Sequence, residues 1–163
     1  MKHILKNIMD AVLAVAAVSF AVACDKSGTD TETVYLPLSY FNIAGVWELV
    51  EWNGEPLADG TYACIELTRQ HEFTSCSNIR TTSNVAEVLT GEFDIDNEDN
   101  TVGGYYDYMD YMQWSHRYVV SELTSDSMIW TATDDPSEVR VYSRIDAIPE
   151  GLIPDTDDEE ETL

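Results

Sequence analysis

The sequence is poor in positive charge. It contains 8 Lys and Arg residues against 31 Asp and Glu residues, and its formal net charge is -23 at pH 7. Loss of residues 1–23 would remove Lys2, Lys6 and Asp10 and leave the charge slightly more negative. Because such a surface repels phosphate backbones and anionic lipid head groups, nucleic acid and acidic membrane surfaces are poor candidates as partners.

A hydrophobic run long enough to cross a membrane as a helix is also missing. The candidate Ala11–Ala23 is shorter than the roughly 20 residues that a spanning helix needs. Lys2 and Lys6 precede this run and small residues lead from it to Cys24, as in an export signal. We therefore expect residues 1–23 to be a signal peptide, with a single-pass signal anchor as the less favoured alternative.

Cysteine is scarce, and the first of the three cysteines follows the signal directly. Ala21-Val22-Ala23-Cys24 resembles the lipobox of bacterial lipoproteins, although the first position is usually Leu. The resemblance implies that Cys24 carries acyl chains such as palmitate, which anchor a protein with ~0.8 kcal/mol per buried CH₂ group. We expect the outer membrane of the cell envelope, although Asp25 resembles an inner-membrane retention signal of enteric bacteria. The alternative is a general secretory signal with an incidental cysteine.

The other two cysteines lie on predicted neighbouring strands. A hairpin with the loop 69–71 sets Cys64 opposite Cys76, and the same register turns Leu67 and Phe73 to the opposite, apolar face. In an oxidising compartment such a pair is a candidate disulfide. Two free thiols on the outer face are the alternative.

Catalytic and cofactor motifs are missing too. After residue 23 the histidines are His71 and His116, and no Gly-x-Ser-x-Gly or phosphate-binding loop is present. The acidic turn at residues 94–100 lacks the Gly and Glu that an EF-hand requires, so it predicts a solvated turn rather than a calcium site. We expect no enzyme, no metal and no cofactor, and no feature indicates an oligomeric state.

What is present is a β pattern between two polar ends. Residues 24–41 have the composition of a flexible tether, and residues 147–163 contain a block of like charges typical of a disordered acidic tail. Residues 42–146 carry every Trp in short alternating segments separated by turn residues. These segments are Ala44–Trp52, Thr61–Thr68, Glu72–Asn78, Val85–Ile95, Thr101–Tyr106, Arg117–Leu123, Ser127–Thr133 and Glu138–Arg144.

Eight successive strands with short links predict an all-β, up-and-down antiparallel sheet. An open sheet of this kind would leave unprotected edges, and closure into a barrel removes them. We therefore expect an eight-stranded barrel, with a two-sheet sandwich as the competing architecture.

The ends of this predicted barrel resemble the lipocalin superfamily, in particular the short lipocalin-like domains of lipoproteins from Bacteroides-type bacteria. In that family a Gly-x-Trp opens the first strand, and its Trp packs beneath an Arg from the last strand. Gly45, Trp47 and Arg144 match these positions. The resemblance implies a barrel closed at this end that binds a small hydrophobic or amphiphilic molecule.

An eight-stranded interior is wide enough either to be filled by side chains or to hold one small ligand. The ligand-lining residues we expect point inward by alternation, and plain core packing is the alternative for each of them. They are Trp47, Leu49, Ile65, Leu67, Phe73, Phe93, Tyr118, Val120, Met128 and Trp130.

A motif near the end of the last predicted strand bears on the ligand. Arg140-Val141-Tyr142 resembles the Arg-x-Tyr of fatty-acid-binding proteins, in which both side chains reach a ligand carboxylate. The favoured interpretation, however, is an Arg140 that points outward and pairs with an acidic neighbour.

The segment 105–114 is dense in aromatic and acidic residues. It is expected to form a strand end and a loop over the barrel mouth, and stacking on sugars is the alternative, which would make the protein a structural or glycan-binding surface module.

Overall fold

The computed structural model describes residues 32–79, 86–108 and 112–153. The predicted signal peptide, Cys24 and most of the acidic tail lie outside these residues. Within them, no helix has both the length and the apolar character needed to cross a membrane. The described residues from Thr33 onward belong to one compact unit.

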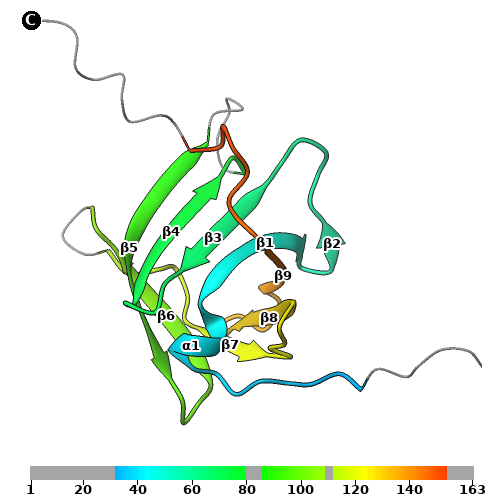
Figure 1. Cartoon of the computed structure of the whole chain (residues 1–163), viewed down its shortest axis with the longest axis vertical. Helices are drawn as coiled ribbons and strands as arrows, with labels where there is room; N and C mark the ends of the chain where they lie inside the picture. The colour runs from blue at the N-terminus through cyan, green and yellow to red at the C-terminus, as the bar shows by residue number, and fades with distance from the viewer. Residues whose placement is uncertain (1–31, 80–85, 109–111, 154–163) are drawn as a thin grey trace, which may run out of the picture. The chain divides into compact units, whose positions relative to one another are not determined.

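The unit is built almost entirely from antiparallel strands (Figure 1). One short helix, α1 (Tyr40–Ile43), precedes them, and Ser39 caps it because its hydroxyl accepts a hydrogen bond from the Asn42 amide. The strands are β1 (Gly45–Trp52), β2 (Glu55–Pro56), β3 (Ala63–Leu67), β4 (Glu72–Ser77), β5 (Glu87–Asp96), β6 (Thr101–Tyr106), β7 (Tyr118–Ser121), β8 (Ser127–Ala132) and β9 (Val139–Ile145).

The sheet closes on itself. Neighbouring strands follow one another from β3 to β9, and β1 pairs with both β3 and β9. Trp47 lies opposite Ile65 on one side and opposite Arg144 on the other. This closure confirms the predicted eight-stranded up-and-down barrel and excludes the two-sheet sandwich.

A two-residue strand, β2, was not expected. Asn53 and Gly54 adopt φ angles of 55° and 81°, as a tight hairpin turn requires, and pair Trp52 with Glu55. The Asn-Gly pair indicates this turn in the sequence, but Pro56 in so short a segment gives no strand pattern.

The packed part of the chain extends further at both ends than the sequence predicts. In the expected tether, the Leu36 amide donates to the Leu123 carbonyl and the Leu38 side chain is buried. In the expected tail, Leu152 lies close enough for its carbonyl to accept a hydrogen bond from the Cys76 thiol, with 3.2 Å between the atoms. Both segments therefore contact the barrel at particular residues, at Leu36 and Leu38 before it and at Leu152 after it.

The two cysteines pair as expected, but they are not bonded to each other. Cys64 lies opposite Cys76, and Leu67 lies opposite Phe73. Both cysteines are free thiols, so the predicted disulfide is wrong for this structure. Burial raises the pKa of the Cys64 thiol to about 11, and the Cys76 thiol is held by the Leu152 carbonyl. Both effects disfavour the thiolate that disulfide formation needs.

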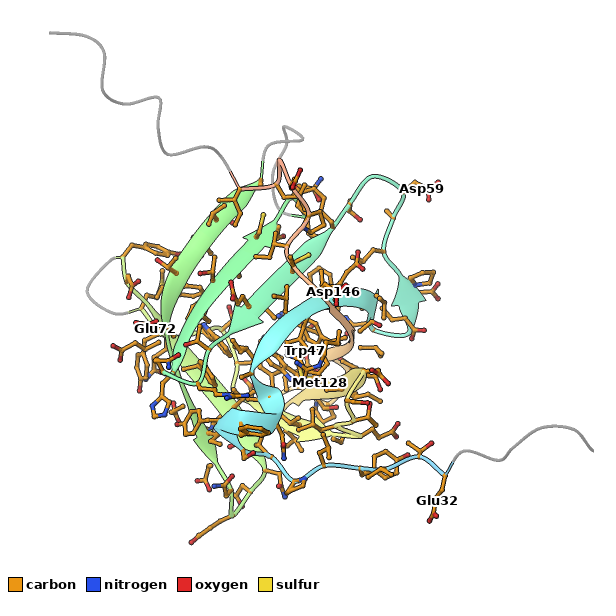
Figure 2. All side chains as sticks on the ribbon, viewed as in Figure 1. Glu32, Trp47, Asp59, Glu72, Met128 and Asp146 are labelled. Carbon is orange, nitrogen blue, oxygen red and sulfur yellow. The ribbon has the colours of Figure 1, made fainter. Side chains whose placement is uncertain are left out.

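One end of the barrel is filled. Trp47, Leu67, Val102 and Met128 are almost completely buried there, and Figure 2 shows Trp47 and Met128 within the barrel. The Arg144 guanidinium lies 4.0 Å from the centre of the Trp47 ring. We call this the closed end.

Backbone carbonyls hold Arg144 in place. Its Nη1, Nη2 and Nε donate to the carbonyl oxygens of Ala44, Asn42 and Ser125 at 2.7, 2.9 and 2.6 Å. Gly45 has a φ of 140°, and a side chain at this position would collide with the guanidinium. Gly45, Trp47 and Arg144 therefore form one packed unit.

Candidate functional site

A pocket of about 160 Å³ occupies the other end of the barrel. The residues on its wall include Trp52 where β1 ends, Ala63 where β3 begins, and Arg140 near the start of β9. Because neighbouring strands run in opposite directions, these positions lie together at the end opposite Gly45 and Arg144. We call this the open end.

Aromatic rings make up much of the pocket wall. Trp130 contacts both Tyr118 and Tyr142, with ring centres 5.4 and 4.9 Å apart. Trp114 stacks on Trp130 and meets Phe73 edge to face. Aromatic surface of this kind binds apolar groups in small-molecule pockets.

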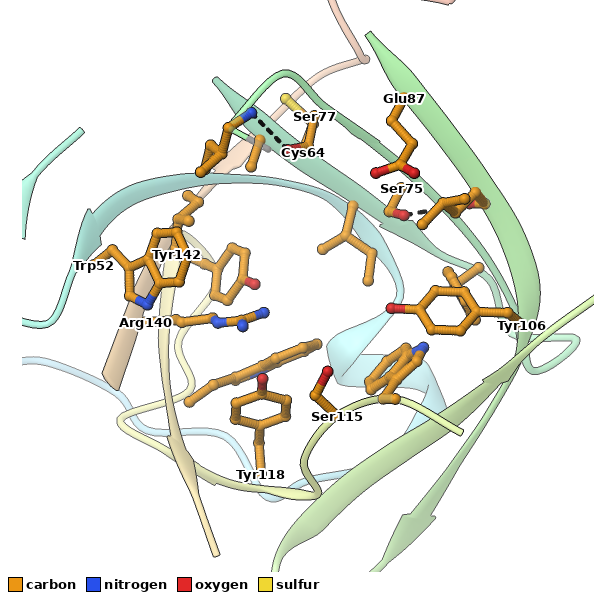
Figure 3. Close-up of a pocket in the computed structure, with 18 residues that line it drawn as sticks. Trp52, Cys64, Ser75, Ser77, Glu87, Tyr106, Ser115, Tyr118, Arg140 and Tyr142 are labelled. Atoms are coloured by element: carbon orange, nitrogen blue, oxygen red, sulfur yellow. Dashed lines mark hydrogen bonds between the residues drawn. The ribbon is translucent and has the colours of Figure 1, made fainter. Parts of the chain in front are cut away.

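A positive charge lies within this aromatic wall. Figure 3 shows the Arg140 guanidinium pointing toward the middle of the pocket, between Tyr142 and Tyr118. It lies 4.9 Å above the centre of the Tyr118 ring and 5.6 Å from that of Trp52. Among the pocket-lining residues it is the basic one, in a chain with a net charge of -23.

Glu138 is the partner of Arg140. Its Oε1 accepts from the Arg140 Nε at 2.8 Å and lies 2.8 Å from Nη2, and its Oε2 accepts from the Trp52 Nε1 at 2.8 Å. The two side chains are 24% and 12% exposed, so this ion pair is better shielded than a surface pair. Burial alone would raise the pKa of Glu138, but the hydrogen bonds from Trp52 and Arg140 outweigh it and lower the pKa.

The neighbouring groups stay in fixed protonation states. Burial would lower the pKa of Arg140, yet Tyr142, Tyr118 and Glu138 around it raise the pKa overall. Burial raises the pKa of both Tyr118 and Tyr142. At neutral pH the pocket wall therefore carries the Arg140 cation, which is paired with Glu138, and two phenol groups that can donate hydrogen bonds. The acidic side chain of Glu87 also lines the pocket.

Seven of the predicted ligand-lining residues line this pocket. The seven are Leu49, Ile65, Phe73, Tyr118, Trp130, Arg140 and Tyr142. The others, Trp47, Leu67, Phe93, Val120 and Met128, belong to the core cluster and are absent from the pocket wall. The structure thus places these five residues in the core, away from the pocket. Arg140 also differs from its favoured interpretation, since it has an acidic partner but points inward.

The residues of the site that were not predicted include Glu138, Trp52 and Trp114. Glu138 stands two positions before Arg140, so the alternation of the strand indicates that it shares the face of Arg140. Trp52 ends the first strand, where its side chain reaches Glu138. Trp114 carries no signal, because its position inside the barrel depends on the path of a connection rather than on strand alternation.

The aromatic segment 105–114 behaves as a strand end and a loop. Tyr106 ends β6, and both Tyr106 and Trp114 line the pocket. Tyr105 and Tyr108 are exposed, and residues 109–111 lie outside the described part of the chain. Two of the rings that could have stacked on sugars, Tyr106 and Trp114, therefore lie on the pocket wall inside the barrel.

Comparison with solved structures supports the fold. No family model matches the sequence, and no curated protein matches it. The structure is similar to the NMR structure of a protein from Bacteroides uniformis ATCC 8492, with 14% sequence identity and a TM-score of 0.50. The match covers 68% of this chain and 94% of that one. At this identity the similarity concerns the fold alone: the chain shares its barrel fold with a Bacteroides protein.

Proposed function

We propose that the protein is a lipocalin-like lipoprotein, anchored in the bacterial outer membrane through Cys24, whose barrel binds a small hydrophobic or amphiphilic molecule. It acts as a binding protein and not as an enzyme. The observation that carries this proposal is the pocket at the open end, where Arg140 points into a space walled by aromatic rings. Small-molecule sites combine an apolar wall with a few polar groups that fix orientation in this way.

The arrangement of Arg140 favours a ligand with an oxygen-rich head. Glu138 binds the guanidinium through Nε and Nη2, and the rest of the group points toward the pocket (Figure 3). The phenol groups of Tyr118 and Tyr142 stand beside it. A carboxylate head would accept hydrogen bonds from these donors while its apolar part lies against Trp130.

Octanoate is a suitable probe for this proposal. The purified full chain is titrated by calorimetry with octanoate and with 1-octanol, which lacks the carboxylate. Replacing both charges, in the double variant Glu138→Gln and Arg140→Gln, avoids an unpaired buried charge. We expect octanoate binding to weaken about tenfold in this variant and octanol binding to change little.

The matched control is Arg117→Gln. Arg117 pairs with Asp94 and is not among the residues that line the pocket, so its loss should leave octanoate binding unchanged. If the folded wild-type chain binds neither probe, the proposed ligand class is wrong. Affinity for glycans in that case would favour the glycan-binding alternative.

The anchor is tested separately in the producing bacterium. Cells are fed an alkyne analogue of palmitate, and the labelled lipid is detected on the protein. We expect the label on the wild-type chain and none on Cys24→Ala, with the variant released from the outer-membrane fraction. An unlabelled wild-type chain would refute lipidation and leave the barrel's ligand to be judged on its own.

A further inference from the structure

Trp114 is a loop residue with its side chain inside the barrel. It precedes β7 and follows the end of β6, and its amide donates to the Gly104 carbonyl at 2.9 Å. The indole lies so close to Gly104 that even a methyl group there would collide with it. The glycine therefore provides the space that the indole occupies.

The indole extends across the interior between opposite walls. β4 and β8 lie on opposite sides of the barrel in the strand order. Trp114 contacts Phe73 on β4, with ring centres 5.0 Å apart, and Trp130 on β8, at 5.8 Å. With Gly104 on β6 behind it, one side chain contacts three walls of the same cavity.

The pocket and the closed end are lined by different residues. Trp47, Leu67 and Met128 fill the closed end and do not line the pocket. Phe73, Trp114 and Trp130 do line it. The indole of Trp114 therefore bounds the pocket where it lies between Phe73 and Trp130, and we call this boundary the floor.

The volume above this floor is small. The pocket measures about 160 Å³, whereas pockets for drug-sized ligands measure roughly 300–1,000 Å³. An apolar cavity of about 150 Å³ holds a single benzene ring. The space suits one ring or a chain segment of similar bulk.

We infer that Trp114 sets the depth of the pocket and thereby selects ligands whose apolar part is one ring or a short chain. This inference rests on the proposed ligand-binding function. A longer chain finds its path toward the closed end blocked by the indole, so its remaining carbons stay in water. Trp114 thus determines the specificity for the length of the apolar part, while Arg140 binds the polar head of the ligand.

The residue can be altered without breaking the sheet. Trp114 lies outside the named strands, and its hydrogen bond to Gly104 comes from the backbone. It is only partly buried against the core. The substitution Trp114→Ala keeps the backbone bond and removes the floor, and Trp114→Leu is the second variant should the first fail to fold.

The test is a chain-length series of saturated carboxylates: hexanoate, octanoate, decanoate and dodecanoate. Each is titrated into the full chain by calorimetry, which does not depend on the removed tryptophan. In the wild-type protein, affinity should stop rising with length once the cavity is full. In the Trp114 variants it should continue to rise, with dodecanoate binding about tenfold tighter than in the wild type, because more methylene groups are buried.

Tyr105→Ala is the matched control. Tyr105 is an exposed aromatic residue of β6, 40% accessible, and its loss should leave the wild-type length profile intact. A wild-type affinity that rises through dodecanoate, or a profile that is the same in the Trp114 variants, would overturn the role of Trp114 while ligand binding stands. If folded wild-type and variant chains bind no member of the series, the proposed function fails as well.

Discussion

The two ends of the barrel each hold an arginine from the same strand. Arg140 and Arg144 lie on β9, with Tyr142 between them on the same face. Arg144 donates hydrogen bonds from Nε, Nη1 and Nη2 to backbone carbonyls, and its guanidinium covers the Trp47 ring. Arg140 binds a carboxylate and points into a pocket. An arginine is thus structural where backbone carbonyls accept its hydrogen bonds, as at Arg144. It can bind a ligand where it borders an open space, as at Arg140.

The electrostatics of the two arginines differ accordingly. Burial lowers the pKa of Arg144, against a smaller raising effect of Asp126. Around Arg140 the two phenol groups and Glu138 outweigh burial and raise the pKa. At the open end the Glu138 carboxylate therefore stabilises the charge of Arg140, and at the closed end neutral backbone carbonyls surround the charge of Arg144.

The largest effect is expected from emptying the closed end. Trp47 is completely buried and its Nε1 donates to the Ile43 carbonyl. We expect Trp47→Ala to lower the free energy of unfolding by about 3–5 kcal/mol, because a large cavity forms and Arg144 loses its aromatic partner. Urea unfolding measures the loss.

The control for this prediction is the same substitution at the open end. Trp52 is half-buried and borders the pocket, so Trp52→Ala should cost only about 1–2 kcal/mol. Equal losses at the two positions would show that the two ends are equally packed and would contradict the comparison.

A smaller loss should follow from crowding Arg144. Gly45 has a φ of 140°, which strains any other residue, and its Cβ would displace the guanidinium. We expect Gly45→Ala to cost about 2–4 kcal/mol, as the sum of backbone strain and disturbed hydrogen bonds. Urea unfolding compares it with Gly60→Ala.

The substitution Gly60→Ala distinguishes backbone strain from the collision with Arg144 as the cause of the lost stability. The φ of 81° at Gly60 also favours glycine, but no atom lies within 4 Å of a Cβ built there. Gly60→Ala should therefore cost about 1 kcal/mol from strain alone. A similar cost for both substitutions would mean that the contact with Arg144 contributes nothing.

The sequence predicts best what depends on alternation along neighbouring strands. The pairing of Cys64 with Cys76 and of Leu67 with Phe73 follows from one hairpin register. The approach of Trp47 to Arg144 follows from the first strand meeting the last. In each case, the alternation of the strands and the closure of the barrel allow only one pairing.

Features that depend on the course of connecting segments could not be predicted. The thiols lie on the outer face as expected, but the chain at Leu152 returns to that face, and the Leu152 carbonyl accepts a hydrogen bond from the Cys76 thiol. Trp114 enters the barrel because Gly104 leaves room for it. The direction of Arg140 depends on Glu138 and Trp52 meeting at the rim. Apart from the two-residue spacing of Glu138 and Arg140, none of these contacts follows from a spacing in the sequence.

The smallest effect concerns the charge of Glu138. Because its pKa in the folded protein lies below the ordinary value of 4.5, the carboxylate adds stability above that pH, and the addition is lost as the pH falls through the folded-state pKa. At pH 7, Glu138→Gln should lower the free energy of unfolding by about 1–2 kcal/mol, because Arg140 loses a charged acceptor.

Urea unfolding of both chains from pH 7 to pH 3 measures this contribution, with the exposed Glu92→Gln as the control that should change little at any pH. The gap between wild type and Glu138→Gln should close in acid, because the wild-type side chain then becomes neutral too. A gap that stays constant would show that shape and not charge matters at this position. Carbonyl oxygens hold Arg144 and do not titrate, so acid should weaken the open end before the closed one.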